Sequence, residues 1–320
     1  MEMTAAPPAG YTVRRPRPTD AGAILEVVSA YNTAVVGFAD CTLDDINDNL
    51  AEPGFAPDTD GWLVHTDTGR AAGYAWVYGT YGSDQVDVDV VAQDPAVTRW
   101  LFEQATERGR VIARDRGHEQ VALDAGIYRR DEGLRDVAIE RGFQPGTTYH
   151  RMRIDHDGPV EGPPLPAGAV LRRGAPDDTA RRAAYHVMTT SFSGQFGITI
   201  RPYEEWHQVR EARPTFDWSQ LSVLELDGRP VAVCESTDQF LEDENCGYIA
   251  RLGVLAEARG RGLAKYLLRK AFAEDAAAGR SGTILHVDTS NRTPALGLYL
   301  SVGMEPVLVI DVWRQVLPTS

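Results

Sequence analysis

Apolar and polar positions along the chain form short strand-like runs that alternate with helical segments. In residues 85–91, valines alternate with polar and acidic residues, which is the pattern of a strand with one exposed face. A helix is predicted over 21–31, with Asp20 as its N-cap. The other elements predicted for the first half are strands at 11–15, 61–65, 71–78, 120–124 and 148–154 and helices at 40–50, 95–116 and 131–141. This alternation predicts an α/β fold.

The second half contains a strand and a helix that are joined by a glycine-rich turn, Arg259–Ala264. Backbone N–H groups in such a turn, together with the helix dipole, form a site for an anion. Gly260 and Gly262 have no Cβ, so a phosphate can approach the backbone closely. The elements predicted here are strands at 169–173, 249–255 and 283–289, a long helix after the turn, and a helix at 293–302.

The predicted elements repeat along the chain. Leu171, Val254 and Met304 follow Val13, Val91 and Phe143, respectively, by about 160 residues each. A nearly constant offset indicates a tandem duplication of one fold.

The boundary between the two copies is predicted from composition. Residues 155–168 are polar and rich in Pro and Gly, which is typical of a linker. We therefore expect one domain over 1–154, a linker over 155–168 and a second domain over 169–320.

The first copy lacks the chemistry of the second. At the position of the glycine-rich turn it has Gln93–Thr98, which contains no glycine, and Asp94 would repel a phosphate. We therefore interpret residues 1–154 as a degenerate copy that is structural or shapes the substrate site. A second anion site in this half is the alternative.

Two motifs of the second half resemble those of the GNAT superfamily, the acyl-CoA-dependent N-acyltransferases. The turn Arg259-x-x-Gly262-x-Ala264 is similar to the Q/R-x-x-G-x-G/A pyrophosphate loop of that family. The family's N-x-x-x-A-x-x-L-Y-x-x-x-G-F pattern is matched, with Met for the final Phe, by Asn291, Ala295, Leu298, Tyr299, Gly303 and Met304.

The two-domain layout resembles the mycothiol synthase type of tandem GNAT protein. That type often carries F-x-x-H-W-G, where this chain has Phe192-x-x-Gln195-Phe196-Gly197. The resemblance therefore does not extend to the acceptor of that enzyme.

The resemblance implies a tandem duplication of the GNAT fold, with a mixed twisted sheet flanked by helices in each half. It also implies acetyl-CoA as the co-substrate and Tyr299 as the acid that protonates the departing CoA thiolate. The residues that it assigns to acetyl-CoA are Leu252, Gly253, Val254, Arg259, Gly260, Arg261, Gly262, Leu263, Ala264, Lys265 and Asn291.

The general base is less clear from the sequence, because Tyr248 stands where many family members have Glu. A carboxylate from elsewhere or a water relay would then remove the proton from the amine. Glu235 is our candidate base, and Asp238 and Asp288 are the alternatives. The residues expected to bind the acceptor are Phe192, Phe196, Trp206, Tyr248 and Asp288.

Composition and charge narrow the classes of function. The chain has 320 residues and a net charge of −14, without the basic face that a nucleic-acid-binding protein needs. Three cysteines without paired spacing favour a reducing compartment. The absence of a signal-like N-terminus and of a long apolar run predicts a cytoplasmic protein with no membrane partner. Acidity favours a cationic or neutral small substrate.

Other chemistries have little support in the sequence. His286 and Asp288 share a strand face but have no further metal ligands nearby, so we expect no metal site. Cys246 has no neighbouring His to activate it as a nucleophile. We therefore expect an N-acetyltransferase that acts on a primary amine of a small molecule. The alternatives are a non-catalytic acyl-CoA sensor and a protein N-terminal acetyltransferase.

Overall fold

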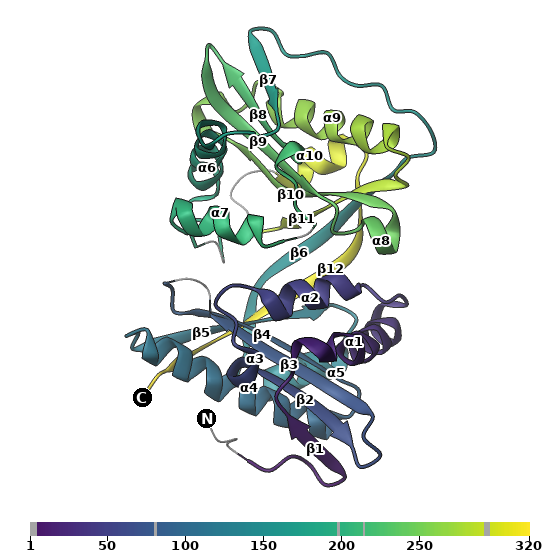
Figure 1. The fold of residues 1–320 in the computed structure, drawn as a ribbon, viewed down its shortest axis with the longest axis vertical. Coiled ribbons are helices and arrows are strands. Elements are labelled where there is room, and N and C mark those ends of the chain that lie inside the picture. The colour runs from purple at the N-terminus through teal and green to yellow at the C-terminus, as the bar shows by residue number, and fades with distance from the viewer. Residues whose placement is uncertain (1–4, 80–81, 197–198, 214, 291–294) are drawn as a thin grey trace. The chain divides into compact units, whose positions relative to one another are not determined.

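The computed structural model describes residues 5–79, 82–196, 199–213, 215–290 and 295–320 (Figure 1). The chain divides into two compact units. Unit 1 consists of Met1–Thr148 and Ile310–Ser320, and unit 2 consists of Tyr149–Val309. Each unit has helices packed against a mixed sheet, so the α/β fold predicted from the sequence is confirmed.

Unit 1 is built on a mixed sheet with the strand order β1-β2-β3-β4-β5-β12. Its strands are β1 (Tyr11–Arg14), β2 (Gly61–Thr66), β3 (Ala71–Gly79), β4 (Gln85–Ala92), β5 (Gln120–Tyr128) and the end of β12 (Glu305–Pro318). Its helices are α1 (Ala21–Val36), α2 (Leu43–Ala51), α3 (Pro57–Asp60), α4 (Pro95–Asp115) and α5 (Glu132–Glu140), with a 3-10 turn at Pro18–Asp20. Among the described strands of this sheet, only β4 and β5 pair in parallel.

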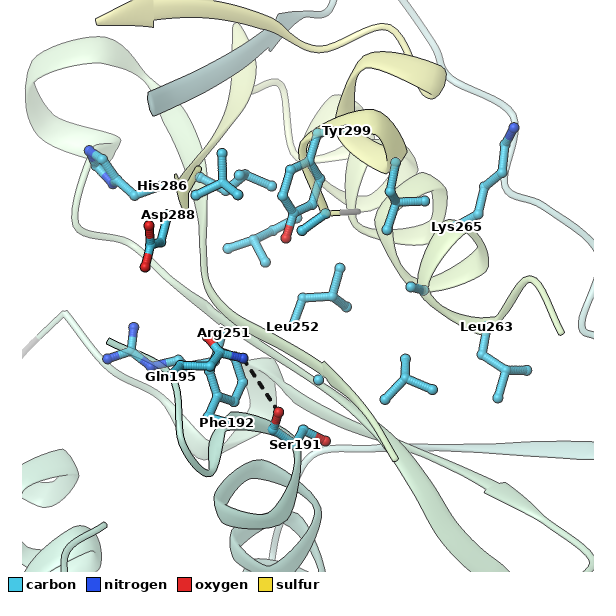
Figure 2. Close-up of a pocket in the computed structure, with 18 of the residues that line it drawn as sticks. Ser191, Phe192, Gln195, Arg251, Leu252, Leu263, Lys265, His286, Asp288 and Tyr299 are labelled. Atoms are coloured by element: carbon cyan, nitrogen blue, oxygen red, sulfur yellow. Dashed lines mark hydrogen bonds between the residues drawn. The ribbon is translucent and has the colours of Figure 1, made fainter. Parts of the chain in front are cut away.

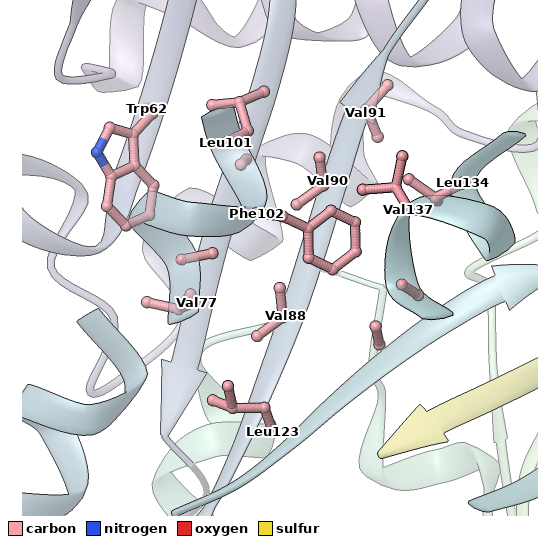
Figure 3. Close-up of a cluster of buried hydrophobic side chains, with 14 of the residues drawn as sticks. Trp62, Val77, Val88, Val90, Val91, Leu101, Phe102, Leu123, Leu134 and Val137 are labelled. Carbon is pink, nitrogen blue, oxygen red and sulfur yellow. The ribbon is translucent and has the colours of Figure 1, made fainter. Parts of the chain in front are cut away.

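Helices cover both faces of this sheet, as the alternation of side chains on β3 shows. A Cβ on Gly73 would lie 2.9 Å from Val97 and 3.3 Å from Leu101, so this position faces α4. The next residue, Tyr74, packs in a buried cluster with Ile24 of α1. Figure 3 shows the larger core, in which Phe102 of α4 lies among side chains of the strands and of α5.

Unit 2 repeats this arrangement with the strand order β7-β8-β9-β10-β11-β6. Its strands are β7 (Ala169–Arg173), β8 (Leu221–Leu226), β9 (Arg229–Thr237), β10 (Cys246–Val254), β11 (Gly282–Asp288) and the end of β6 (Gln144–Asp155). Its helices are α6 (Asp178–Phe192), α7 (Tyr203–Glu211), α8 (Leu241–Glu244), α9 (Leu263–Ala277) and α10 (Ala295–Ser301), with 3-10 turns at Trp218–Gln220 and Ala256–Ala258. Again only one pair of strands in the described part of this unit, β10 and β11, is parallel.

The two halves of the chain exchange their last strands. In unit 2, residues 149–155 of β6 pair with β11. In unit 1, residues 310–318 of β12 pair with β5. The unit boundaries therefore differ from those predicted, because the chain passes from unit 1 to unit 2 within β6 and returns within β12. Residues 155–168, expected to join the two domains, lie inside unit 2, where 156–168 connect β6 to β7.

Some local predictions need correction. The aromatic-rich segment 191–206, which holds Phe192, Phe196 and Trp206, is typical of a recognition loop in sequence, but α6 continues to Phe192 and α7 begins at Tyr203. The C-terminal strand β12 was not predicted at all. No helix within the described residues is both long and apolar enough to cross a membrane.

Candidate functional site

The site begins where two neighbouring strands of unit 2 separate. The parallel pairing of β10 with β11 runs from Cys246 opposite Gly282 to Ile249 opposite Leu285, and it stops there. Beyond Ile249 the edge of β10 that faces β11 has no pairing partner on that strand, so its backbone groups are available to a ligand. On its other side, β10 stays paired with β9 through Val254.

A cavity of about 540 Å³ occupies this opening (Figure 2). Lys265 and Leu263, at the start of α9, lie at one end of it, and Arg251, His286 and Asp288 lie at the other. The cavity therefore joins the glycine-rich turn to a polar region through the gap between β10 and β11.

The glycine-rich turn has the backbone geometry of an anion-binding loop. Gly260 and Gly262 adopt φ angles of 74° and 77°, a region that favours glycine. A Cβ at either position would meet no atom within 4 Å, so the space above both residues is open. Gly262 is the N-cap of α9, whose first backbone N–H groups have no intrahelical acceptor.

Of the three cationic side chains in the turn and the first turn of α9, two line the cavity and one does not. Arg259 and Lys265 line the cavity, as do Leu263 and Ala264. The Nε of Arg259 donates a hydrogen bond to the Val254 carbonyl at 3.1 Å, which ties the turn to the end of β10. Arg261 is exposed and is not among the lining residues.

The wall between the two ends of the cavity comes from β10. Leu252, Gly253 and Val254, which the resemblance assigns to acetyl-CoA, line it. A Cβ on Gly253 would lie 2.9 Å from the Cβ of Ser191 and 3.4 Å from the ring of Phe192. Glycine is therefore needed here because α6 packs directly on the strand.

Tyr299 of α10 lies in the cavity wall with its hydroxyl directed into the cavity (Figure 2). Its side chain is 8% exposed. Burial, with a smaller contribution from Cys234, raises its pKa to about 12. No hydrogen bond joins the Tyr299 hydroxyl to another described residue. The phenol therefore keeps its proton at neutral pH and can donate it to a group in the cavity.

The polar end contains a tyrosine–histidine pair and a carboxylate. The Tyr248 hydroxyl lies 3.1 Å from Nδ1 of His286. Burial, together with the positive charges of Arg151 and Arg251, lowers the pKa of His286 to about 4, so the imidazole is neutral at pH 7. Asp288 lines the cavity and accepts hydrogen bonds at 2.8 Å from the backbone N–H and hydroxyl of Ser290.

Two residues expected in the site lie elsewhere. Glu235, the candidate base, is 6% exposed, and its Oε2 accepts hydrogen bonds from Arg210 at 2.7 and 2.9 Å. Trp206 is 6% exposed and packs in a core cluster, where its ring stacks on that of Tyr203 from the same helix, α7. Neither lines the cavity, because both face the packing between β9 and the α6–α7 segment.

The other expected acceptor residues line the cavity: Phe192, Phe196, Tyr248 and Asp288. Asn291 lies outside the described residues. Sequence reasoning did not assign Arg251, Gln195 and Tyr149 to the site, although they also line it. In the sequence, Gln195 is noticeable only as a departure from a family motif. The spacing of residues does not point to Arg251, because the face of β10 from which its side chain projects depends on an irregularity in that strand.

The equivalent turn of unit 1 is occupied by the chain itself. The Asp94 carboxylate caps α4 by accepting the Ala96 N–H at 2.7 Å, and it also accepts the Tyr11 hydroxyl at 2.8 Å. The first helical residue is Pro95, which has no N–H. A carboxylate therefore stands at the helix end where unit 2 is open to an anion.

Comparison with known proteins agrees with this geometry. Residues 184–304, which hold nearly all of the cavity, match the Acetyltransferase (GNAT) family. The chain therefore carries a GNAT domain. The family is one of acyltransferases, and the GNAT domain belongs to unit 2. No curated protein matches the chain in a sequence search.

Solved structures show that the GNAT fold extends over both units. A GCN5-related N-acetyltransferase from Sphaerobacter thermophilus is 23% identical, with a TM-score of 0.82 and 98% of each chain covered. A tandem GNAT protein from the clavulanic acid biosynthesis pathway is 16% identical, with a TM-score of 0.73, covering 97% of this chain and 99% of that one. The tandem GNAT fold predicted from the sequence is thus confirmed.

A more distant structure holds an acyl-CoA. The N-myristoyltransferase of Saccharomyces cerevisiae with bound myristoyl-CoA is 13% identical, with a TM-score of 0.63, covering 97% of this chain and 84% of that one. The fold of this chain is therefore shared with a protein that binds an acyl-CoA.

Proposed function

We propose that the chain transfers the acetyl group of acetyl-CoA to a primary amine of a small molecule. The observation that carries this proposal is the continuity of one cavity from the glycine-rich turn, past the unpaired edge of β10 and Tyr299, to a polar end. Acyl transfer from CoA requires these three regions in this order.

The donor is assigned from the shape of the turn and from the family. The CoA pyrophosphate would lie over Gly260 and Gly262, with the N–H groups at the start of α9 and the Lys265 side chain as donors. The pantetheine arm would follow the free edge of β10, whose backbone groups hold the thioester in place. Acetyl is chosen as the acyl group because the matched family is one of acetyltransferases.

The chemistry follows from the groups at the gap. The neutral amine attacks the thioester carbonyl to form the carbon–nitrogen bond, and the carbon–sulfur bond breaks. Tyr299 gives its proton to the departing thiolate, and the proton released by the new amide nitrogen restores the phenol. The ammonium form of the acceptor must first lose a proton. Among the described lining residues Asp288 is the one carboxylate, so it takes the role that the sequence suggested for Glu235, directly or through water.

The test of this function is release of free CoA thiol from acetyl-CoA in the presence of a library of small amines. The expected result is thiol release that depends on both the protein and the amine. Acetyl-CoA binding without release by any amine would favour a sensor, and release with peptide N-termini alone would favour a protein acetyltransferase.

The donor site has a test of its own in Gly262→Asp. The substitution adds bulk and negative charge where the phosphate would approach, so acetyl-CoA affinity should fall at least tenfold, about 1.4 kcal/mol. Isothermal calorimetry measures this change. Gly279→Asp is the matched control, because Gly279 also has a φ of 77° with no atom within 4 Å of a Cβ, but it lies at the other end of α9. Equal affinity in wild type and Gly262→Asp would show that the turn is not the phosphate site.

A further inference from the structure

An irregularity in β10 directs Arg251 into the polar end of the cavity. The register of β10 against β9 shifts between Ile249 and Arg251, so two residues of β10 lie opposite one of β9. Arg251 consequently lies opposite Glu235, on the same sheet face as Tyr248 opposite Thr237. Without this bulge Arg251 would point to the α9 face.

The same face of β11 carries the other polar lining residues. Tyr248 lies opposite Ile284 in the parallel pair, and His286 and Asp288 follow at alternate positions. Arg251, His286 and Asp288 therefore enter one end of the cavity from two diverging strands, as Figure 2 shows.

Arg251 has no acidic partner among the described residues, although an acid lies directly across from it. The Glu235 carboxylate opposite is bound by Arg210 of α7 through both Nε and Nη2. The hydrogen bond that the structure gives to the Arg251 guanidinium is from Nη1 to the neighbouring Ala250 carbonyl, at 2.7 Å. The side chain is exposed to the cavity, so a ligand can reach it.

A second arginine, Arg210, lies near Arg251. Burial lowers the pKa of Arg210, and the positive charge of the nearby Arg251 lowers it further. Two arginines thus lie near one carboxylate, that of Glu235, and Arg210 is the one that binds it. In a chain with a net charge of −14, this is a local excess of positive charge beside Asp288.

We propose that the acceptor is a small amine that also carries a carboxylate, as an amino acid does, and that Arg251 binds this carboxylate. The planar guanidinium fits a carboxylate through two parallel hydrogen bonds. The amino group of the same molecule would lie toward Asp288 and the gap between β10 and β11. The inference rests on the proposed acetyl transfer and names the class of its acceptor.

The experiment compares matched acceptors on the wild-type protein. Release of CoA thiol from acetyl-CoA is measured with each amino acid of a panel. The same assay is run with the primary amide of that amino acid and with the corresponding amine that lacks the carboxylate. The expected kcat/KM of the best amino acid exceeds that of its amide by about tenfold to a hundredfold, the range of a charge-assisted pair. Arg251→Gln should remove this preference and leave acetyl-CoA affinity within about twofold, whereas the control Arg229→Gln, at an exposed arginine outside the cavity, should keep the preference.

The outcomes separate this inference from the proposed function. Turnover of amides and plain amines at the rate of amino acids, or an unchanged preference in Arg251→Gln, would overturn the inference and leave acetyl transfer standing. If no amine is acetylated, calorimetric titration of the CoA-saturated protein with the same amino acids decides whether Arg251 forms a carboxylate site. Binding that Arg251→Gln abolishes supports the carboxylate site in a non-catalytic protein, and no such binding overturns it.

Discussion

Tyr299 is a buried phenol whose hydroxyl faces a cavity rather than another side chain. Its surroundings explain why this position is suited to an acid. Burial raises its pKa to about 12, because a phenolate would be poorly solvated among the apolar side chains that surround it. The same apolar surroundings would make a thiolate in the gap a strong proton acceptor.

Tyr299→Phe should lower kcat by about 10²–10⁴ with little change in acetyl-CoA affinity, because the lost hydroxyl acts mainly in the transition state. The ring is kept, so packing in the unit 2 core should survive. Steady-state kinetics and calorimetry measure the two quantities. Tyr266→Phe is the matched control, since Tyr266 packs on the same core from α9 but does not line the cavity. Turnover within about threefold of wild type would instead point to water or Tyr248 as the proton source.

His286 makes stability depend on pH in a defined window. In the folded protein its pKa is about 4, below the usual 6.5, because burial and the charges of Arg151 and Arg251 disfavour the imidazolium. Between these values the unfolded chain binds a proton that the folded chain does not, so the stabilising contribution falls as pH falls from 6.5 toward 4.

The comparison with His286→Gln isolates this effect. The free energy of unfolding of wild type, minus that of His286→Gln, should decrease as pH is lowered through the window, as measured by urea unfolding. The exposed His186→Gln variant provides the control. A difference that stays constant with pH would show that His286 titrates normally in the folded state.

The elements nearest the glycine-rich turn were the most predictable from the sequence, and those that shape the polar end of the cavity were the least. The repeat of the first half's opening strand located β7 at its observed bounds, and glycine spacing located the turn before α9. The direction of Arg251 depends on a bulge, which is a property of strand pairing that a single strand's sequence does not contain. The burial of Glu235 could not be predicted for a related reason, because its partner Arg210 comes from α7, a helix that was not predicted from the sequence.

Strand exchange could not be predicted from the repeat. A sequence repeat shows which strands of the two halves correspond to each other. Because β6 and β12 correspond, the repeat alone allows either of them to pair with β5 or with β11. The structure places β12 on β5 and β6 on β11. Each unit is therefore completed by a strand from the other half of the chain.

Cleavage of the segment 156–168 tests this exchange. The segment is largely exposed, without helix or strand, and a Glu-specific protease can cut after Glu161. The two fragments should co-elute in native size-exclusion chromatography, because the N-terminal one contains β6 and the C-terminal one contains β12. They should separate in denaturant. Separation under native conditions would contradict the exchanged pairing.

At the scale of the whole molecule, one fold is present twice and one copy is open to an anion. In each unit a helix connects two parallel strands: α4 joins β4 to β5, and α9 joins β10 to β11. They differ at the start of that helix. In unit 2 two glycines leave the helix end open, and in unit 1 Asp94 and Pro95 close it.

Titration of the intact protein with acetyl-CoA should therefore give one site per chain. Calorimetry measures the stoichiometry, and Gly262→Asp should remove this single site rather than half of the signal. Asp94→Ala should not create a second one, because Pro95 still provides no N–H and the turn Gln93–Thr98 still has no glycine to bring its backbone near a phosphate. Two equivalent sites in the wild-type protein would mean that the helix end of α4 opens to acyl-CoA despite its own carboxylate, and the interpretation of unit 1 as a degenerate copy would then be wrong.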